Sequence, residues 1–364
     1  MPPRRIHLPL SILLMALCAS GTIRAGEVGR PTVGAIRWDA WSGGAVTAQV
    51  EKTLGPSRFH HRLPWFAQVA GPDTVSIAGA TSEIMDREIA FAADAGLDYW
   101  AFLLYPSDSP MSSALAGYLA SPVRNRLGFC LILHNSLTVA AERWPAERDR
   151  AVALLGERGF QRIPDGRPLV YIFCGQKMPW DRLAEFTQAA ATAGHNPYLA
   201  YMAWNPKDFR TVKDRGIAAM SAYAVGGDMP AFAGLVAKAE ADWATAAKQD
   251  IPWIPLVTTG WDKQPRQANP VTWEPPASNG YRDQKTWPAQ ATPAEIAAHL
   301  QRALAFVAAH PAICPARTVI AYAWNEYDEG GWLAPTRAVD GSPDTSRLDA
   351  LRAVLRPVGA TPAR

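Results

Sequence analysis

Short apolar runs alternate with amphipathic segments along nearly the whole chain. The apolar runs cover residues 33–38, 97–105, 127–134, 169–174, 198–204, 218–223, 252–261 and 318–325. The segments with helical periodicity cover residues 83–95, 111–120, 145–158, 181–193, 206–214, 229–248, 293–309 and 346–356. Continuously apolar runs of this length are typical of parallel strands buried on both faces. Eight strands, each followed by one helix, predict an α/β fold, a single-domain (β/α)8 TIM barrel over residues 26–364.

An open, doubly wound parallel sheet is the alternative that fits the same alternation. Helix start signals such as Thr292-Pro293 with Glu295, and Gly96 just past a predicted helix end, fit either architecture. No GxGxxG or GxxxxGK[ST] sequence follows any predicted strand, which removes the usual nucleotide-binding signatures.

Two connections are much longer than the few residues usual between strand and helix: 39–82 and 262–292. Both leave the carboxyl end of a strand, which is the face that carries active sites in barrels of this kind. We therefore expect these segments to form walls of a substrate site, with some of their tryptophans folding the segments onto the barrel instead. These tryptophans are Trp41, Trp65, Trp273 and Trp287.

Residues 1–25 resemble a secretory signal peptide, with Arg4 and Arg5 before an apolar run and small residues at 25–26. An uncleaved membrane anchor is the alternative, but the run is shorter than the roughly 20 residues of a membrane span. The expected mature protein is secreted or periplasmic, monomeric and not membrane-bound. The first 25 residues hold three of the 36 basic residues and none of the 33 acidic ones, so the rest of the chain is formally neutral. Neutrality gives no support for a nucleic-acid partner.

Three cysteines remain beyond the signal segment, and they do not form a disulfide framework or a CxxC motif. Cys130 and Cys174 lie in predicted strands, where they are either buried thiols or a single bridge. No His/Cys cluster has metal-ligand spacing, so we expect no metal and no other cofactor.

The predicted strands end in aromatic and polar residues. A sugar ring presents an apolar face that stacks on aromatic rings, and hydroxyls that require donors and acceptors. The sequence therefore predicts a carbohydrate substrate, although core packing also explains part of the 14 tryptophans. The strand-end candidates for substrate binding are Trp38, Asp39, Tyr105, His134, Trp204, Tyr223, Trp261, Asp262, Trp324 and Asn325.

Carboxylates are densest in residues 324–332, WNEYDEGGW. Glu326 and Glu329 are three residues apart, a spacing that brings two side chains to one side of a turn. Glycosidases of the retaining type use two carboxyl groups, one ionised and one protonated. Glu326 and Glu329 are thus the candidate catalytic pair, and Tyr327 between them is a candidate substrate contact. The alternative is an ordinary acidic surface turn.

Residues 318–336, TVIAYAWNEYDEGGWLAPT, resemble the signature of glycoside hydrolase family 99 and its WbsX-like relatives. Residues 85–106 and the segment TTGWDKQPR at 258–266 are similar to further parts of that family, and 34–43 more loosely so. The chain departs from the family pattern at Asp328, where the mannosidases carry histidine, and at Phe173-Cys174-Gly175, where they carry a histidine-containing acidic motif.

The resemblance implies a retaining glycosidase of α-mannosidic linkages, often of the endo type, in which the substrate's own 2-hydroxyl attacks the anomeric carbon to give a 1,2-anhydro sugar. By resemblance, Glu326 is the base for that hydroxyl and Glu329 protonates the leaving oxygen. Asn325 orients sugar hydroxyls, and Arg266, Asp262 and Trp261 line the subsites. A non-catalytic carbohydrate-binding barrel and a glycosyltransferase or transglycosylase of polysaccharide assembly are the alternatives.

Overall fold

The computed structural model describes residues 29–173, 178–274 and 281–356. Eight parallel strands form one sheet in the hydrogen-bonded order β8-β7-β6-β5-β4-β1-β10-β9. Their bounds are β1 (Thr32–Arg37), β4 (Tyr99–Leu104), β5 (Gly128–Leu133), β6 (Leu169–Ile172), β7 (Tyr198–Met202), β8 (Ala219–Ser221), β9 (Leu256–Thr258) and β10 (Thr318–Tyr322). All eight predicted strands are confirmed, each shortened at one or both ends.

The two end strands of this sheet meet just before β9. Met220 in β8 bridges Trp253 in parallel, and its amide donates to the carbonyl of Pro252 at 2.8 Å. The amide of Ile254 returns a bond to the Met220 carbonyl at 2.8 Å. The sheet is therefore a nearly closed barrel, which confirms the (β/α)8 prediction and excludes the open sheet.

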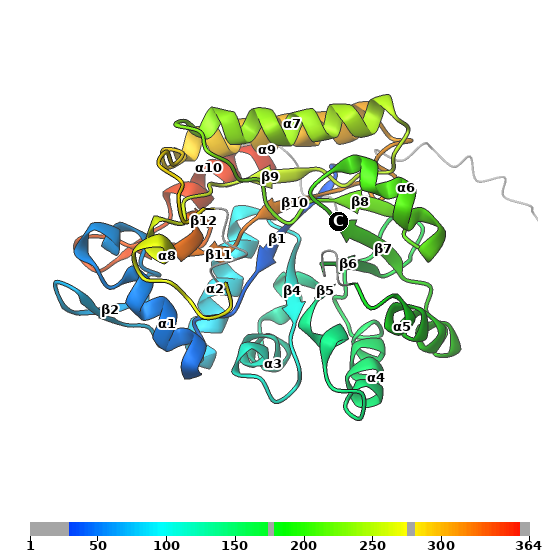
Figure 1. The fold of residues 1–364 in the computed structure, drawn as a ribbon, viewed down its shortest axis with the longest axis horizontal. Helices are drawn as coiled ribbons and strands as arrows, with labels where there is room; N and C mark the ends of the chain where they lie inside the picture. The colour runs from blue at the N-terminus through cyan, green and yellow to red at the C-terminus, as the bar shows by residue number, and fades with distance from the viewer. Residues whose placement is uncertain (1–28, 174–177, 275–280, 357–364) are drawn as a thin grey trace, which may run out of the picture. The chain divides into compact units, whose positions relative to one another are not determined.

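Helices follow the strands and pack around the barrel (Figure 1). Their bounds are α2 (Ser82–Ala95), α3 (Ser113–Ala120), α4 (Trp144–Leu154), α5 (Trp180–Thr192), α6 (Phe209–Val212), α7 (Phe232–Lys248), α9 (Pro293–Ala309) and α10 (Ser346–Leu355). The capping box between Thr292 and Glu295 fixes the start of α9, as the sequence indicates. Gly96 ends α2 in the left-handed conformation, with φ 92°.

The long connections contain regular structure that the sequence did not reveal. The first holds α1 (Gly44–Leu54), a 3-10 turn (Ser57–Arg62) and the hairpin of β2 (Gln68–Gly71) and β3 (Thr74–Ser76). The second holds α8 (Gln264–Ala268). The amide of Thr272 in the second connection donates to the Gln49 side chain in the first at 2.7 Å, so the two segments contact each other.

Beyond β10 the chain forms two small antiparallel pairs. These are β11 (Asn325–Glu326) with β12 (Gly331–Trp332), and β13 (Thr336–Arg337) with β14 (Pro343–Asp344). The first pair carries both candidate glutamates on a tight turn, and it lies directly against the barrel strands (Figure 1).

The barrel interior contains a hydrogen-bonded layer of hydroxyl groups. Tyr99 from β4 shares hydrogen bonds of 2.9 Å with Tyr171 from β6 and with Thr318 from β10, and all three side chains are buried. Because each buried hydroxyl has a partner, this layer joins strands from three parts of the barrel without an unsatisfied polar group.

Two cysteines of the described residues, Cys130 and Cys314, are buried free thiols. Cys174 lies outside the described residues, as does the predicted signal segment 1–25. Among the helices of the described ranges, none has both the length and the apolar character needed to cross a bilayer.

A buried histidine between α7 and α9 predicts a pH-dependent stability. His299 is fully buried and stacks on Trp243 with ring centroids 5.2 Å apart. Burial lowers the His299 pKa from 6.5 to about 4. The unfolded chain therefore binds this proton first, and stability falls as the pH drops from about 6.5 towards 4.

We expect the lowered His299 pKa to reduce the free energy of unfolding by about 2 kcal/mol between pH 7 and pH 5. Urea unfolding of the wild type and of His299→Phe at both pH values measures it. The variant lacks the titrating ring and is expected to lose less stability over this interval. Equal losses in both proteins would contradict the assignment to His299.

Candidate active site

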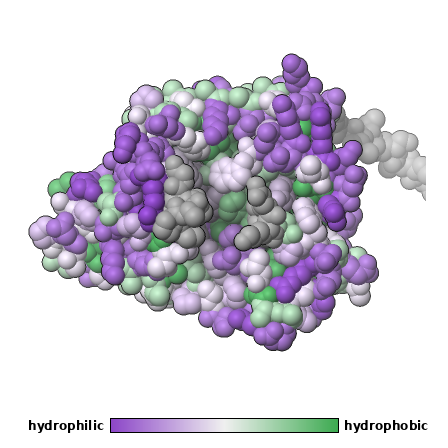
Figure 2. All heavy atoms as spheres, in the orientation of Figure 1, coloured by the Kyte–Doolittle hydropathy of each residue, from purple (hydrophilic) through white to green (hydrophobic). Residues whose placement is uncertain are grey.

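A cavity of about 710 Å³ opens at the carboxyl ends of the barrel strands. The face shown in Figure 2 is hollowed near its centre, and much of the coloured surface farther out on this face is hydrophilic. Nine of the predicted site residues line this cavity: Trp38, Tyr105, His134, Trp204, Tyr223, Trp261, Arg266, Glu326 and Glu329. They come from seven different strand ends and from the second long connection, so the fold brings together residues spread over most of the chain.

The β11–β12 turn holds the two glutamates. Glu326 ends β11, and a 3-10 turn over Tyr327–Glu329 leads to Gly330, which has φ 81°. A Cβ atom on Gly330 would lie 2.6 Å from the amide nitrogen of Asp262, so only glycine fits this approach. That amide donates to the Glu329 carbonyl at 2.6 Å, which ties the turn to the segment after β9.

Glu329 is surrounded by donors. The guanidinium of Arg266 and the ammonium of Lys263, the latter at 3.0 Å, contact Oε1, and the Tyr322 hydroxyl donates to Oε2. Burial alone would raise the Glu329 pKa, but the two cations and the Tyr322 hydrogen bond lower it to about 2. These contacts favour the ionised form of Glu329.

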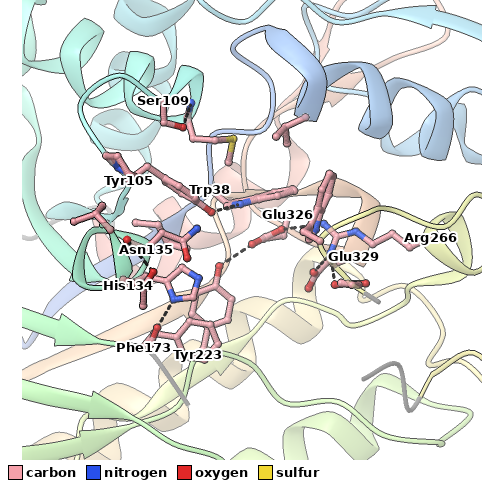
Figure 3. A pocket seen from close by; sticks show the side chains of 18 of the residues that line it. Trp38, Tyr105, Ser109, His134, Asn135, Phe173, Tyr223, Arg266, Glu326 and Glu329 are labelled. Carbon is pink, nitrogen blue, oxygen red and sulfur yellow. Dashed lines mark hydrogen bonds and ion pairs between the residues drawn. The ribbon is translucent and has the colours of Figure 1, made fainter. Parts of the chain in front are cut away.

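Glu326 has the opposite environment. It is 2% exposed, its Oε1 accepts a 2.8 Å hydrogen bond from Tyr223, and its Oε2 has no hydrogen-bond partner among the described residues. Burial, together with the charge of Glu329, raises the Glu326 pKa well above its usual value, against a weaker opposing effect of Arg266. The two glutamates thus lie in one cavity (Figure 3), and their surroundings shift their pKa values in opposite directions.

Arg266 connects the acidic groups of the site. Its Nε and Nη2 bind the two oxygens of Asp328 at 2.7 and 3.0 Å, and its Nη1 binds both Glu329 and Glu274. Asp328 is fully buried and does not line the cavity. Asp328 therefore anchors Arg266 by accepting two parallel hydrogen bonds from its guanidinium.

Aromatic rings form the opposite side of the cavity. Phe173 stacks on Tyr223 with centroids 4.3 Å apart and an interplanar angle of 11°. The His134 ring also stacks on Phe173, with centroids 5.3 Å apart. Trp204 lies 6.5 Å from Phe173 and is 60% exposed, unusual for so large an apolar side chain. Trp38 donates its indole N–H to Tyr105 at 2.9 Å (Figure 3).

Five predicted binding residues are buried behind the cavity wall. Asp39 is held by Arg37 at 2.9 Å and by the Asn325 side chain, while Asp262 is paired with Arg62 from the first long connection. Trp324 and Tyr327 are fully buried in the core. Asn325 accepts the Trp38 amide at 2.9 Å, so its contact with the site is indirect. None of Asp39, Asp262, Trp324, Asn325 and Tyr327 lines the cavity.

Sequence reasoning missed charged residues of the second long connection. Lys263 and Glu274 line the cavity, and Glu274 accepts from both Lys263 and Arg266 at 2.7 Å. Trp273 also lines it, as the interpretation of this connection as a substrate wall predicts, whereas Trp41 and Trp65 are buried and Trp287 packs on Tyr281. The one signal in the sequence was that Lys263 directly follows Trp261-Asp262, in the segment 258–266 that resembles glycoside hydrolase family 99.

In the described ranges no group of three or more His, Cys, Asp or Glu side chains is arranged to hold a metal ion. The carboxylates that come close to one another are bound by Arg266 and Lys263 instead. The chemistry that this arrangement offers is proton transfer and charge stabilisation by side chains.

No protein-family model matches the chain, and no curated protein sequence matches it. Solved structures do resemble it. The GH99 endo-α-mannosidase from Bacteroides thetaiotaomicron in complex with bis-tris propane superposes with a TM-score of 0.55 over 88% of this chain and 94% of its own, at 13% identity. A second structure of a GH99 endo-α-mannosidase from that organism gives a TM-score of 0.53 over 88% and 95%, at 12% identity. At these identities the likeness establishes a shared (β/α)8 fold.

Proposed function

We propose that this protein is a retaining glycoside hydrolase that cleaves a glycan with Glu326 and Glu329 as its carboxyl pair, exported to the periplasm or the medium. The observation that carries the proposal is a pair of buried glutamates, with pKa values shifted in opposite directions by their surroundings, in a cavity with aromatic walls at the carboxyl ends of barrel strands. Retaining hydrolysis requires one carboxyl group to give a proton while the other is ionised.

α-Mannosides are the substrates to test first. The solved structures of similar fold are endo-α-mannosidases, and the motifs at 318–336 and 258–266 resemble the same family. In the chemistry that the resemblance implies, one glutamate takes the proton of the 2-hydroxyl as its oxygen closes on the anomeric carbon, and the other protonates the departing oxygen. Water then opens the 1,2-anhydro sugar, and retention of configuration results.

Incubation with α-mannans and with plant and bacterial polysaccharides tests the proposal. New reducing ends from the wild type, and none from the Glu326→Gln/Glu329→Gln double variant, are expected. Both replacements are isosteric, so a folded double variant is expected to bind glycan without cleaving it. Glycan binding without cleavage by the wild type would instead indicate a non-catalytic binding barrel, and transfer to an added sugar acceptor in place of hydrolysis would indicate a transglycosylase.

Trp204 is expected to bind a sugar unit at the mouth of the cavity, because an exposed indole there offers a stacking surface. Trp204→Ala is expected to raise KM for long oligosaccharides about 5- to 30-fold, corresponding to roughly 1–2 kcal/mol of lost stacking. Its kcat is expected to stay within twofold of the wild type. Trp204→Phe keeps a ring and retains most of the affinity. Steady-state kinetics with oligosaccharides of increasing length provide the measurement, and an unchanged KM in Trp204→Ala would contradict this role.

A further inference from the structure

The turn that carries the two glutamates is bound at each end by a different part of the chain. At the Glu329 end, the amide of Asp262 donates to the Glu329 carbonyl at 2.6 Å. At the Glu326 end, the preceding residue Asn325 contacts the segment 38–41, which follows β1. The separation of the two carboxyl groups therefore depends on both anchors, and the second consists of buried polar groups that the proposed function does not yet explain.

Asn325 is bound by that segment at three points. Its Oδ1 atom accepts the amide N–H of Trp38 at 2.9 Å, its carbonyl accepts the indole N–H of Trp41 at 3.0 Å, and its side chain is hydrogen-bonded to Asp39. Asn325 and Asp39 are both buried, and neither lines the cavity. Both residues therefore lie behind the cavity wall, out of reach of a bound sugar.

The orientation of the Asn325 amide group is fixed by its partners. The Trp38 N–H can only donate, so the amide oxygen of Asn325 faces it and the NH₂ group faces Asp39. The carboxyl group of Asp39 supplies the acceptor that this NH₂ group requires. Without that acceptor a buried donor would have no partner, which costs more free energy than the bond itself contributes.

Asp39 is itself anchored to the barrel. Its Oδ1 atom accepts from Nε of Arg37, the last residue of β1, at 2.9 Å. The same guanidinium binds Glu88 in α2 at 2.7 Å, and its carbon atom lies 4.4 Å from the centroid of the Trp100 ring in β4. Buried contacts thus run from α2 through the end of β1 to Asn325. Regular elements of this kind hold functional groups more precisely than loops do.

We propose that Asp39 is a positioning residue of the active site, which holds Asn325, and through it the strand β11 with Glu326, in a fixed place against the end of β1. This inference rests on the proposed function, and it replaces the expectation that Asp39 and Asn325 bind sugar hydroxyls themselves. The same amide group of Asn325 also holds the backbone of Trp38 in the cavity wall. A displacement of about 1 Å at a reacting group can cost about 100-fold in rate, so Asp39 affects catalysis without touching the substrate.

Asp39→Ala removes the acceptor. We expect kcat on the cleaved glycan to fall about 10- to 100-fold, with KM within about threefold of the wild type because the cavity keeps its lining side chains. Asp98→Ala is the matched control, since Asp98 accepts the amide of Val33 at 2.7 Å near the opposite end of β1. It is expected to lose stability in urea unfolding while kcat stays within about twofold of the wild type. An unchanged kcat in folded Asp39→Ala, or an equal loss of kcat in both variants, would overturn the proposal.

Exchanging the two side chains provides a rescue, and it decides the matter if Asp39→Ala does not fold. Asp39→Asn has too few acceptor oxygens to keep the bonds from both Arg37 and Asn325, and Asn325→Asp brings two carboxyl groups together, so each is expected to lose about tenfold or more in kcat. The double variant Asp39→Asn/Asn325→Asp again pairs an amide donor with a carboxylate acceptor. Its kcat is expected to exceed that of the less active single variant by about fivefold or more. No recovery in the double variant would contradict the proposal.

Crystal structures of the variants provide a measurement that needs no turnover. In the wild type the Tyr223 hydroxyl donates to Oε1 of Glu326 at 2.8 Å. In Asp39→Ala we expect β11 and this carboxyl group to shift by about 1 Å, which lengthens or breaks that bond, and in Asp98→Ala we expect no shift. Glu326 at its wild-type position in Asp39→Ala would overturn the proposal. If the wild type cleaves no glycan, the proposed function fails, while the crystal structures still decide whether Asp39 positions Glu326.

Discussion

Replacing Arg266 with methionine is expected to abolish activity and to destabilise the fold at the same time. The guanidinium is 1% exposed and binds Asp328, Glu329 and Glu274. Without it the remaining side-chain hydrogen bond to Asp328 among the described residues comes from Thr53 at 3.3 Å, and the carboxylate stays buried. Removing one partner of such a buried pair costs about 3–5 kcal/mol. Urea unfolding measures the stability, and assays on the cleaved substrate measure the activity.

A double variant separates these two effects. In Arg266→Met/Asp328→Asn the uncompensated charge is gone, and we expect at least half of the lost stability to return. Activity is not expected to return, because Glu329 still lacks its strongest cation. Arg266→Lys is the matched single change: it keeps a charge but not the fork, and it should be more stable than Arg266→Met. Equal stability of Arg266→Met and the wild type would contradict the assignment of Arg266 as the anchor of this cluster.

Replacing Trp324 with alanine is expected to produce the other large loss, in stability alone. Trp324 is fully buried and packs on Trp100 with ring centroids 5.1 Å apart. Removing a core tryptophan costs about 3–5 kcal/mol through lost burial and the cavity left behind. Because the ring lies behind the cavity wall, KM of the remaining folded protein is expected to stay near the wild-type value.

Trp324→Phe is the milder control. The indole N–H of Trp324 has no hydrogen-bond partner among the described residues, so phenylalanine loses volume but no polar contact. Its destabilisation is expected to be smaller than that of the alanine variant. Chemical unfolding combined with steady-state kinetics checks both. A raised KM in Trp324→Phe at unchanged stability would place this ring in the substrate site, contrary to its position here.

The barrel could be predicted from the sequence because its signals are local and repeated. Strands such as β4 and β5 are continuous apolar runs, and α9 starts with a complete capping box. Helix α1 was missed because its local signals are weak. It begins at Gly44 after Gly43, with no side-chain cap and no acidic residue in its first turn. Such a helix forms because it packs against the rest of the fold, and its local sequence preference contributes little.

The sequence indicated which strand ends surround the candidate site. It did not indicate which of their side chains face the cavity. Trp38 and Trp324 both follow an apolar strand, yet one lines the cavity and the other fills the core. Lys263 and Glu274 are ordinary charged residues of a long connection in the sequence, and their places in the ion-pair cluster around Glu329 depend on how that connection folds back. Contacts between residues distant in the chain leave no local sequence pattern, so the roles of Lys263 and Glu274 could not be inferred from their spacing.

The bonds that Asp262 makes suggest that the two sides of the cavity tolerate amino-acid substitutions to different degrees. Asp262 pairs with Arg62 in the first long connection, and its amide donates to the Glu329 carbonyl, so bonds join both connections to the turn that carries the carboxyl pair. Sequence changes on that side would disturb the reacting groups. On the aromatic side Tyr223 donates a hydrogen bond to Glu326, whereas the ion pairs of the two glutamates among the described residues come from Lys263 and Arg266 on the charged side. Divergence of substrate range among descendants of this protein is therefore expected to accumulate on the aromatic side, while the charged side stays constant.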